Sequence, residues 1–115
     1  MTNPTIAAVT FDCADAAALG TFWASVLGRT LGDDASSDYA SLAGSPPLMF
    51  FSVPEGKTAK NRVHLDIAVD DLPAQVDRAI GLGAKRLGDF DESGFVWTTL
   101  ADPEGNEFDL VQGGH

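Results

Sequence analysis

The chain has 115 residues, 44% of them hydrophobic, which suits a single domain with one modest core. Its 17 acidic and 7 basic residues give a formal charge of −10, and no basic cluster offsets it, so nucleic-acid binding is disfavoured. No apolar run approaches the roughly 18 residues of a membrane span, and we expect a cytoplasmic protein that makes no membrane contact.

The first half predicts a strand, a helix and three further strands. Ile6–Asp12 is a short run with several β-branched residues, as expected for a strand. Asp15 is a suitable cap for a helix whose apolar residues recur at helical spacing until Gly28. Cys13 lies in an apolar run and is expected in the core. Short strands separated by polar turns are then predicted at Arg29–Asp33, Tyr39–Ala43 and Leu48–Val53.

The same pattern restarts after a polar link. Arg62–Val69 predicts a strand, and Asp70 or Asp71 caps a helix that is expected to end at Gly83. Three strands are predicted to follow, at about Ala84–Phe90, Phe95–Ala101 and Glu107–Gln112. We therefore predict one domain over residues 1–115, made of modules 1–54 and 62–112 joined by a linker, 55–61.

A repeated segment supports this division. Leu27–Asp33 reads LGRTLGD and Leu82–Asp89 reads LGAKRLGD, and each copy follows a helical pattern. The predicted fold is α+β, with two βαβββ modules related by a pseudo-twofold axis. Their curled mixed sheets would enclose a cleft lined by strand residues, with the helices on the outer face.

Two motifs carry a resemblance to a known family. The strand Val63–Val69 with its early histidine, and the closing segment Asp102–Val111 (DPEGNEFDLV), resemble the vicinal oxygen chelate superfamily, which includes glyoxalases, bleomycin-resistance proteins and extradiol dioxygenases. The similarity is greatest to its small glyoxalase-like branch and covers nearly the whole chain. It implies the paired modules described above and, in metal-dependent members, four strand residues that converge on one divalent ion.

The resemblance implies an incomplete metal site. The second module offers His64 and Asp109, which suit Zn, Ni, Fe or Mn. The corresponding first-module positions fall at Ala8 and at Phe50, or at Phe51 if the register slips by one, and none of these side chains can bind an ion. Three protein ligands are the usual minimum for a catalytic ion, so we expect no resident cofactor; a divalent metal is the alternative.

The expected site is instead a small-molecule pocket. Aromatic rings and carboxylates suit a flat or cationic ligand through stacking, cation–π contact and charge pairing. The candidate lining residues are His64, Asp66, Asp109, Trp97, Phe50, Tyr39 and Asp12. Core packing is an equal alternative for Trp97, and a hydrogen bond to Asp109 is an alternative role for His64.

Three functions follow from these observations. The first is a metal-independent small-molecule binding protein of the glyoxalase/bleomycin-resistance type, which the resemblance implies is a homodimer. The second is a lyase, isomerase or dioxygenase of the same superfamily, with a divalent ion on His64 and Asp109. The third is a protein–protein interaction module whose sheet face is covered by a partner. The sequence identifies neither the ligand nor catalytic residues.

Overall fold

The computed structural model describes residues 3–112. The chain divides into two compact units, residues 1–56 and 57–115, and each is described by itself. Both begin with a strand and a helix and continue with strands alone, as the repeat predicts. Among the described residues, no helix has the length and apolar character needed to span a membrane.

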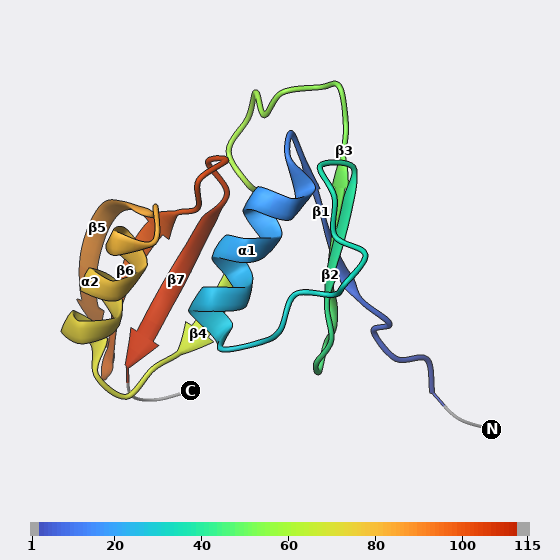
Figure 1. Ribbon diagram of the computed structural model, residues 1–115. Coiled ribbons are helices and arrows are strands. Elements are labelled where there is room, and N and C mark those ends of the chain that lie inside the picture. Colours follow the sequence, from blue (N-terminus) through green and yellow to red (C-terminus); the bar gives the residue numbers. More distant parts are fainter. Residues whose placement is uncertain (1–2, 113–115) are drawn as a thin grey trace. The chain divides into compact units, whose positions relative to one another are not determined.

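The first unit places one helix on one face of a mixed sheet (Figure 1). The strands run in the order β1-β3-β2, with β1 parallel to β3 and β2 antiparallel to it. The elements are β1 (Val9–Cys13), α1 (Ala16–Leu27), β2 (Tyr39–Leu42) and β3 (Leu48–Ser52).

The prediction of a strand at Arg29–Asp33 is wrong, and the first sheet has three strands rather than four. Leu31 makes a single antiparallel bridge to Leu42. The chain then turns, because the amide of Ala35 donates to the carbonyl of Gly32. The aspartates that follow Gly32 are weak strand formers and favour turns, so the turn replaces the predicted strand.

The ends of α1 agree with the sequence prediction. The side chain of Asp15 accepts a hydrogen bond from the amide of Ala18, and Gly28 ends the helix in the left-handed region at φ 65°. Cys13 is buried, as expected, at 4% exposure. Trp23 is buried on the sheet side of the helix, where its ring lies 5.5 Å from that of Phe11.

The second unit has the same order of elements with one more strand. Its sheet runs β4-β7-β6-β5, with β4 parallel to β7 and the other pairs antiparallel. Ser93 and Gly94, both at positive φ, make the tight turn between β5 and β6. The fold is α+β, as predicted. The elements are β4 (Leu65–Ala68), α2 (Leu72–Gly81), β5 (Lys85–Glu92), β6 (Phe95–Ala101) and β7 (Glu107–Gln112).

The cap of α2 gives a direct test of local sequence rules. The sequence allows Asp70 or Asp71, and in the structure the side chain of Asp71 accepts from the amide of Ala74 at 3.2 Å. We expect Asp71→Ala to lower the free energy of unfolding by about 1 kcal/mol, because the amide of Ala74 in the first turn of the helix loses its side-chain acceptor. Asp70→Ala, the matched control, should change it by less than about 0.5 kcal/mol. Chemical denaturation measures both, and equal losses would exclude the cap as the cause.

A polar group lies on the helix-facing side of the second sheet. Arg86 donates to one carboxylate oxygen of Asp89, and the buried hydroxyl of Thr98 donates to the other at 2.9 Å. The hydrogen bond from Arg86, followed by that from Thr98, holds the pKa of Asp89 below its usual value of 3.8.

This lowered pKa predicts a specific pH dependence of stability. A carboxylate with a depressed folded-state pKa contributes stability that is complete above its unfolded pKa and is lost as pH falls through the folded value. We expect Asp89→Asn to be less stable than the native chain above about pH 4, with the difference disappearing as the pH falls further. Denaturation curves at stepped pH values measure this difference. If the difference in stability between the native chain and Asp89→Asn stayed constant across the acid range, the ionised carboxylate of Asp89 would not be its cause.

The two units can be aligned through their helix caps. Asp15 and Asp71 are 56 residues apart, which matches His64 to Ala8. Val9 lies opposite Leu48 in the first sheet, and Leu65 lies opposite Phe108 in the second. Leu48 therefore corresponds to Phe108, and Met49, one residue later, corresponds to Asp109.

Candidate functional site

The sheet of the second unit has one face turned away from α2, here called the open face. Strand residues alternate between the two faces, and Thr98 and Leu100 point toward the helix side, where they are buried. Asp109 lies opposite Asp66 on one side and Thr99 on the other. Three polar side chains therefore form a row across β4, β7 and β6 on the open face.

His64 extends this row just before β4. Its Nδ1 lies 3.1 Å from Oδ1 of Asp66 and 3.8 Å from Oδ2 of Asp109. The sequence spacing explains the first contact, because residues two apart in an extended segment share a face. The imidazole is half exposed, with 51% of its side chain accessible, so it remains reachable by a ligand.

Among His64, Asp66 and Asp109, the side chain of Asp109 is the most enclosed. Its side chain is 16% exposed, and its Oδ1 accepts a hydrogen bond of 2.6 Å from the hydroxyl of Thr99. This bond fixes the carboxylate and leaves Oδ2 directed toward His64. Asp66 is 42% exposed and has more freedom to adjust.

An aromatic pair adjoins the carboxylates. Trp97 stacks on Phe90, with ring centroids 5.2 Å apart and planes 17° apart, across the β5–β6 pair. A cavity of about 350 Å³ is lined by His64, Asp66, Phe95, Trp97, Asp109 and Val111. A second cavity of about 340 Å³ shares His64 and Asp109 and reaches Phe90 and the ion pair of Lys60 with Glu107. The open face therefore offers carboxylates beside aromatic surface.

The same residues form a set of three possible metal donors. One nitrogen of His64 and one oxygen each of Asp66 and Asp109 lie within 4.8 Å of one another. Zinc bonds of ~2.0–2.1 Å in tetrahedral geometry place ligand atoms about 3.3–3.4 Å apart. The 3.1 and 3.8 Å separations from His64 Nδ1 bracket that spacing. An imidazole with two carboxylates fits a divalent ion such as Zn or Mn.

Sequence reasoning counted two potential metal ligands in this unit and missed Asp66 in that role. The signal was present in the sequence, because Asp66 follows His64 by two residues in a predicted strand. Phe90, Phe95 and Val111 were also missed as lining residues. They lie on three strands and come together only through the strand pairing.

The first-unit candidates occupy two different environments. Asp12 is exposed, and the ring of Tyr39 lies 5.0 Å from that of Phe51, on the face of the first sheet away from α1. Phe50 is fully buried, at 0% exposure, and stacks on Phe11 at 5.1 Å. The structure brings together His64, Asp66, Trp97 and Asp109, whereas Phe50 packs inside the first unit.

The register also corrects the match proposed for Asp109. Sequence reasoning placed its first-unit counterpart at Phe50 or Phe51, and the strand pairing places it at Met49. The thioether of Met49 is a weak ligand for hard divalent ions, and the methyl group of Ala8 cannot bind one. Of the four strand positions compared, only His64 and Asp109 of the second unit therefore carry side chains that suit a divalent ion.

Comparison with known proteins places this fold. The family model of the glyoxalase-like domain matches residues 8–111. No curated protein matches the chain. A glyoxalase/bleomycin resistance protein/dioxygenase family enzyme from Burkholderia phytofirmans PsJN is similar, with 19% identity and a TM-score of 0.80 over 94% of this chain and 98% of that one.

Two further solved structures share the fold. The bleomycin-binding protein of Streptomyces verticillus, solved with copper(II)-bleomycin, has 19% identity and a TM-score of 0.67, with 100% of both chains covered. The genomically encoded fosfomycin resistance protein of Listeria monocytogenes has 10% identity and a TM-score of 0.79 over 98% of this chain and 96% of that one. The chain belongs to the glyoxalase-like domain family, within the vicinal oxygen chelate superfamily.

Proposed function

We propose that the second unit binds a small, flat, positively charged molecule on its open face, without a metal ion. The observation that carries this proposal is the cavity of about 350 Å³ in which Asp66 and Asp109 lie beside Trp97. A cation held near both carboxylates would gain charge pairing, and its flat part would lie on the indole. The volume is within the usual range for ligand sites, ~300–1,000 Å³.

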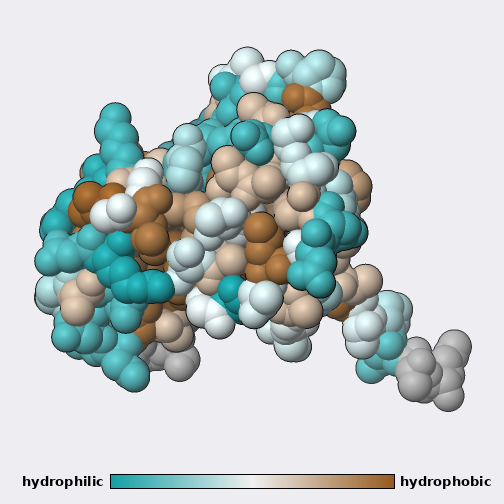
Figure 2. Space-filling model, in the orientation of Figure 1, coloured by the Kyte–Doolittle hydropathy of each residue, from teal (hydrophilic) through white to brown (hydrophobic). Residues whose placement is uncertain are grey.

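The charge of the whole chain supports the same class of ligand. The formal charge is −10. The face drawn in Figure 2 carries both hydrophilic and hydrophobic patches. A negative field raises the local concentration of cations and speeds their association. Among the fold neighbours, the Streptomyces verticillus protein is described as binding copper(II)-bleomycin, which supports small-molecule binding on this fold.

Benzamidine is a suitable probe, because it joins a flat ring to a cationic, planar amidinium. We expect saturable binding by titration calorimetry, with chemical-shift changes at the amides of Asp66, Trp97 and Asp109. Benzoate, of the same shape and opposite charge, is the matched control and should bind at least about tenfold more weakly. Equal binding of both, or shifts away from these residues, would contradict the proposal.

A second function is favoured by the three-donor set. His64, Asp66 and Asp109 together would hold a divalent ion, as in a lyase, isomerase or dioxygenase of the superfamily. A bound ion would supply a Lewis acid for neighbouring oxygen atoms of a substrate. Thr99 would then orient Asp109 through its 2.6 Å hydrogen bond, and Trp97 would position the substrate.

Metal analysis separates the two functions. The binding function predicts less than about 0.1 equivalent of Zn, Ni, Fe or Mn in purified protein, and no change with His64→Ala. The metal-dependent function predicts close to one equivalent of metal in the native chain, and a loss of at least tenfold in metal affinity when one of the three donor side chains is replaced.

In either case we expect a homodimer, with a mass in sedimentation of twice the 12.0 kDa of one chain.

A further inference from the structure

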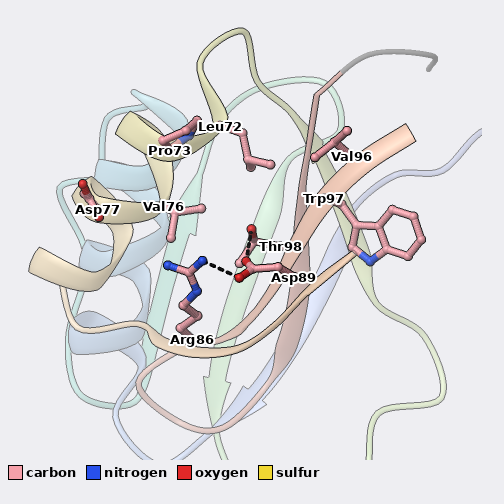
Figure 3. A pocket seen from close by; sticks show the side chains of 9 residues that line it. All are labelled: Leu72, Pro73, Val76, Asp77, Arg86, Asp89, Val96, Trp97 and Thr98. Carbon is pink, nitrogen blue, oxygen red and sulfur yellow. Dashed lines mark hydrogen bonds and ion pairs between the residues drawn. The ribbon is translucent and has the colours of Figure 1, made fainter. Parts of the chain in front are cut away.

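A third cavity in this unit lies on the opposite side of the sheet from the two already described. One helix has a diameter of about 10–12 Å, whereas four strands spaced ~4.8 Å apart make a wider sheet, so α2 leaves part of its face uncovered. The resulting groove lies between α2 and the edge strand β5 and has a volume of about 260 Å³ (Figure 3). Leu72, Pro73, Val76 and Asp77 of α2 line one side.

The other side of the groove is polar. Arg86 and Asp89 of β5 point toward each other, and the hydroxyl of Thr98 reaches the same carboxylate from β6 (Figure 3). In a strand packed fully under a helix these positions would be apolar. In this sheet the positions hold the Arg86–Asp89 ion pair and the buried Thr98, which lie opposite apolar side chains of α2. Trp97 lines both this groove and the open-face cavity, but its ring is turned away from Arg86 and Asp89 (Figure 3), and no other lining residue is shared by the two cavities.

The ion pair keeps unused hydrogen-bonding capacity. The guanidinium carries several N–H donors besides the one that bonds Asp89 within residues 3–112, and a carboxylate accepts more than one hydrogen bond per oxygen. Both side chains are about half exposed, at 49% for Arg86 and 57% for Asp89. A donor and an acceptor are therefore available side by side at the mouth of an apolar groove.

Charge selects the class of ligand. The pair of Arg86 and Asp89 is neutral as a unit, so an anion would compete with Asp89 for the guanidinium and would also meet the chain's formal charge of −10. A cation would in turn compete with Arg86 for Asp89 and be repelled by the guanidinium. Asp77 of α2 also lines the groove, but its carboxylate lies apart from this pair (Figure 3). A neutral group that donates to Asp89 and accepts from Arg86, as an amide does, satisfies both side chains without separating them.

We propose that this groove binds a small neutral molecule with an apolar body and an amide-like edge. The apolar body would lie on Leu72 and Val76, and the edge would bond to Arg86 and Asp89. The volume is below the ~300–1,000 Å³ range of drug-sized sites, so the ligand is fragment-sized. This site is independent of the function proposed for the open face.

Three probes of one shape test the proposal by protein NMR: benzamide, benzoate and benzamidine. We expect benzamide to shift the amides of Val76 and Thr98 and the side-chain Nε–H of Arg86, with saturation. Benzoate and benzamidine should bind in the groove at least about tenfold more weakly. Arg86→Gln removes the charged donor and should weaken benzamide by about tenfold or more.

A second variant keeps the test independent of the ion pair. Val96 lines the groove and is 41% exposed, so Val96→Trp should fill the space without disturbing the core and abolish the shifts. Val63→Trp, at a residue 80% exposed and outside the groove lining, is the matched control and should leave benzamide binding unchanged.

His64→Ala distinguishes the groove from the open-face site. It changes a residue of the open face and should leave benzamide binding in the groove unchanged. The proposal is overturned if none of the probes shifts these resonances, if benzoate binds there more tightly than benzamide, or if Val96→Trp leaves the shifts intact. Failure of benzamidine to bind beside Asp109 would contradict the open-face function alone.

Discussion

Phe50→Ala is expected to lower the free energy of unfolding of the first unit by about 3–5 kcal/mol, the usual cost of removing a buried phenylalanine side chain. Phe50 is 0% exposed and stacks on Phe11 at 5.1 Å, so its loss leaves a cavity between helix and sheet. Denaturant unfolding measures the change. Trp23, which is 1% exposed, reports on this unit by fluorescence in a Trp97→Phe background.

The next residue supplies the control. Phe51 is on the opposite face of the same strand and is 40% exposed, so Phe51→Ala should cost about 1 kcal/mol or less. The pair of variants separates core packing from ligand contact. If Phe50→Ala left stability unchanged and weakened benzamidine binding instead, the sequence-based hypothesis that Phe50 lines the pocket would be restored.

Asp109→Asn is expected to weaken benzamidine binding by about tenfold or more, because a charged hydrogen-bond acceptor contributes roughly 1.5–3 kcal/mol. The hydroxyl of Thr99 can still donate to the amide oxygen of asparagine, so the free energy of unfolding should change by less than about 1 kcal/mol. Titration calorimetry and chemical denaturation on the same samples measure the two effects separately.

Asp70→Asn is the matched control for charge. It removes the same single negative charge from an exposed position in the second unit that lines neither open-face cavity. If Asp109 acts through direct contact, Asp70→Asn should leave the benzamidine affinity nearly unchanged at about 0.15 M salt, where exposed charges are strongly screened. An equal loss in both variants would show that the overall charge, rather than the site, attracts the ligand.

The elements predicted best are those set by local chemistry. The caps Asp15 and Gly28 fix the ends of α1, and the apolar periodicity between them is strong. The strands Phe95–Ala101 and Glu107–Gln112 were predicted with their observed bounds, because turn residues flank both. The strand expected at Arg29–Asp33 failed because the chain turns after Gly32, where aspartates favour a turn, and leaves only the single bridge between Leu31 and Leu42.

The sequence predicts part of the candidate site. His64 and Asp109 were proposed from the motifs that carry the family resemblance, and strand periodicity would have added Asp66 as a possible donor beside them. Phe50 was misplaced because Leu48–Phe51 is continuously apolar, so no alternation reveals which residues face the helix. An error of one residue in the register of a strand assigns every side chain to the wrong face. The register of β3 follows from its pairing with β1, which the sequence alone does not give.

The bulge in β5 bears on how copies of this chain behave when crowded together. Within the described sheet, β5 is a terminal strand of eight residues, long enough to template amyloid-like stacking with a neighbouring molecule. Its pairing shifts between Arg86 and Gly88, which breaks the regular row of backbone groups. In a parallel, in-register copy of β5, the acidic side chains of Asp89, Asp91 and Glu92 would lie beside their own counterparts, and this repulsion disfavours fibril growth along the strand.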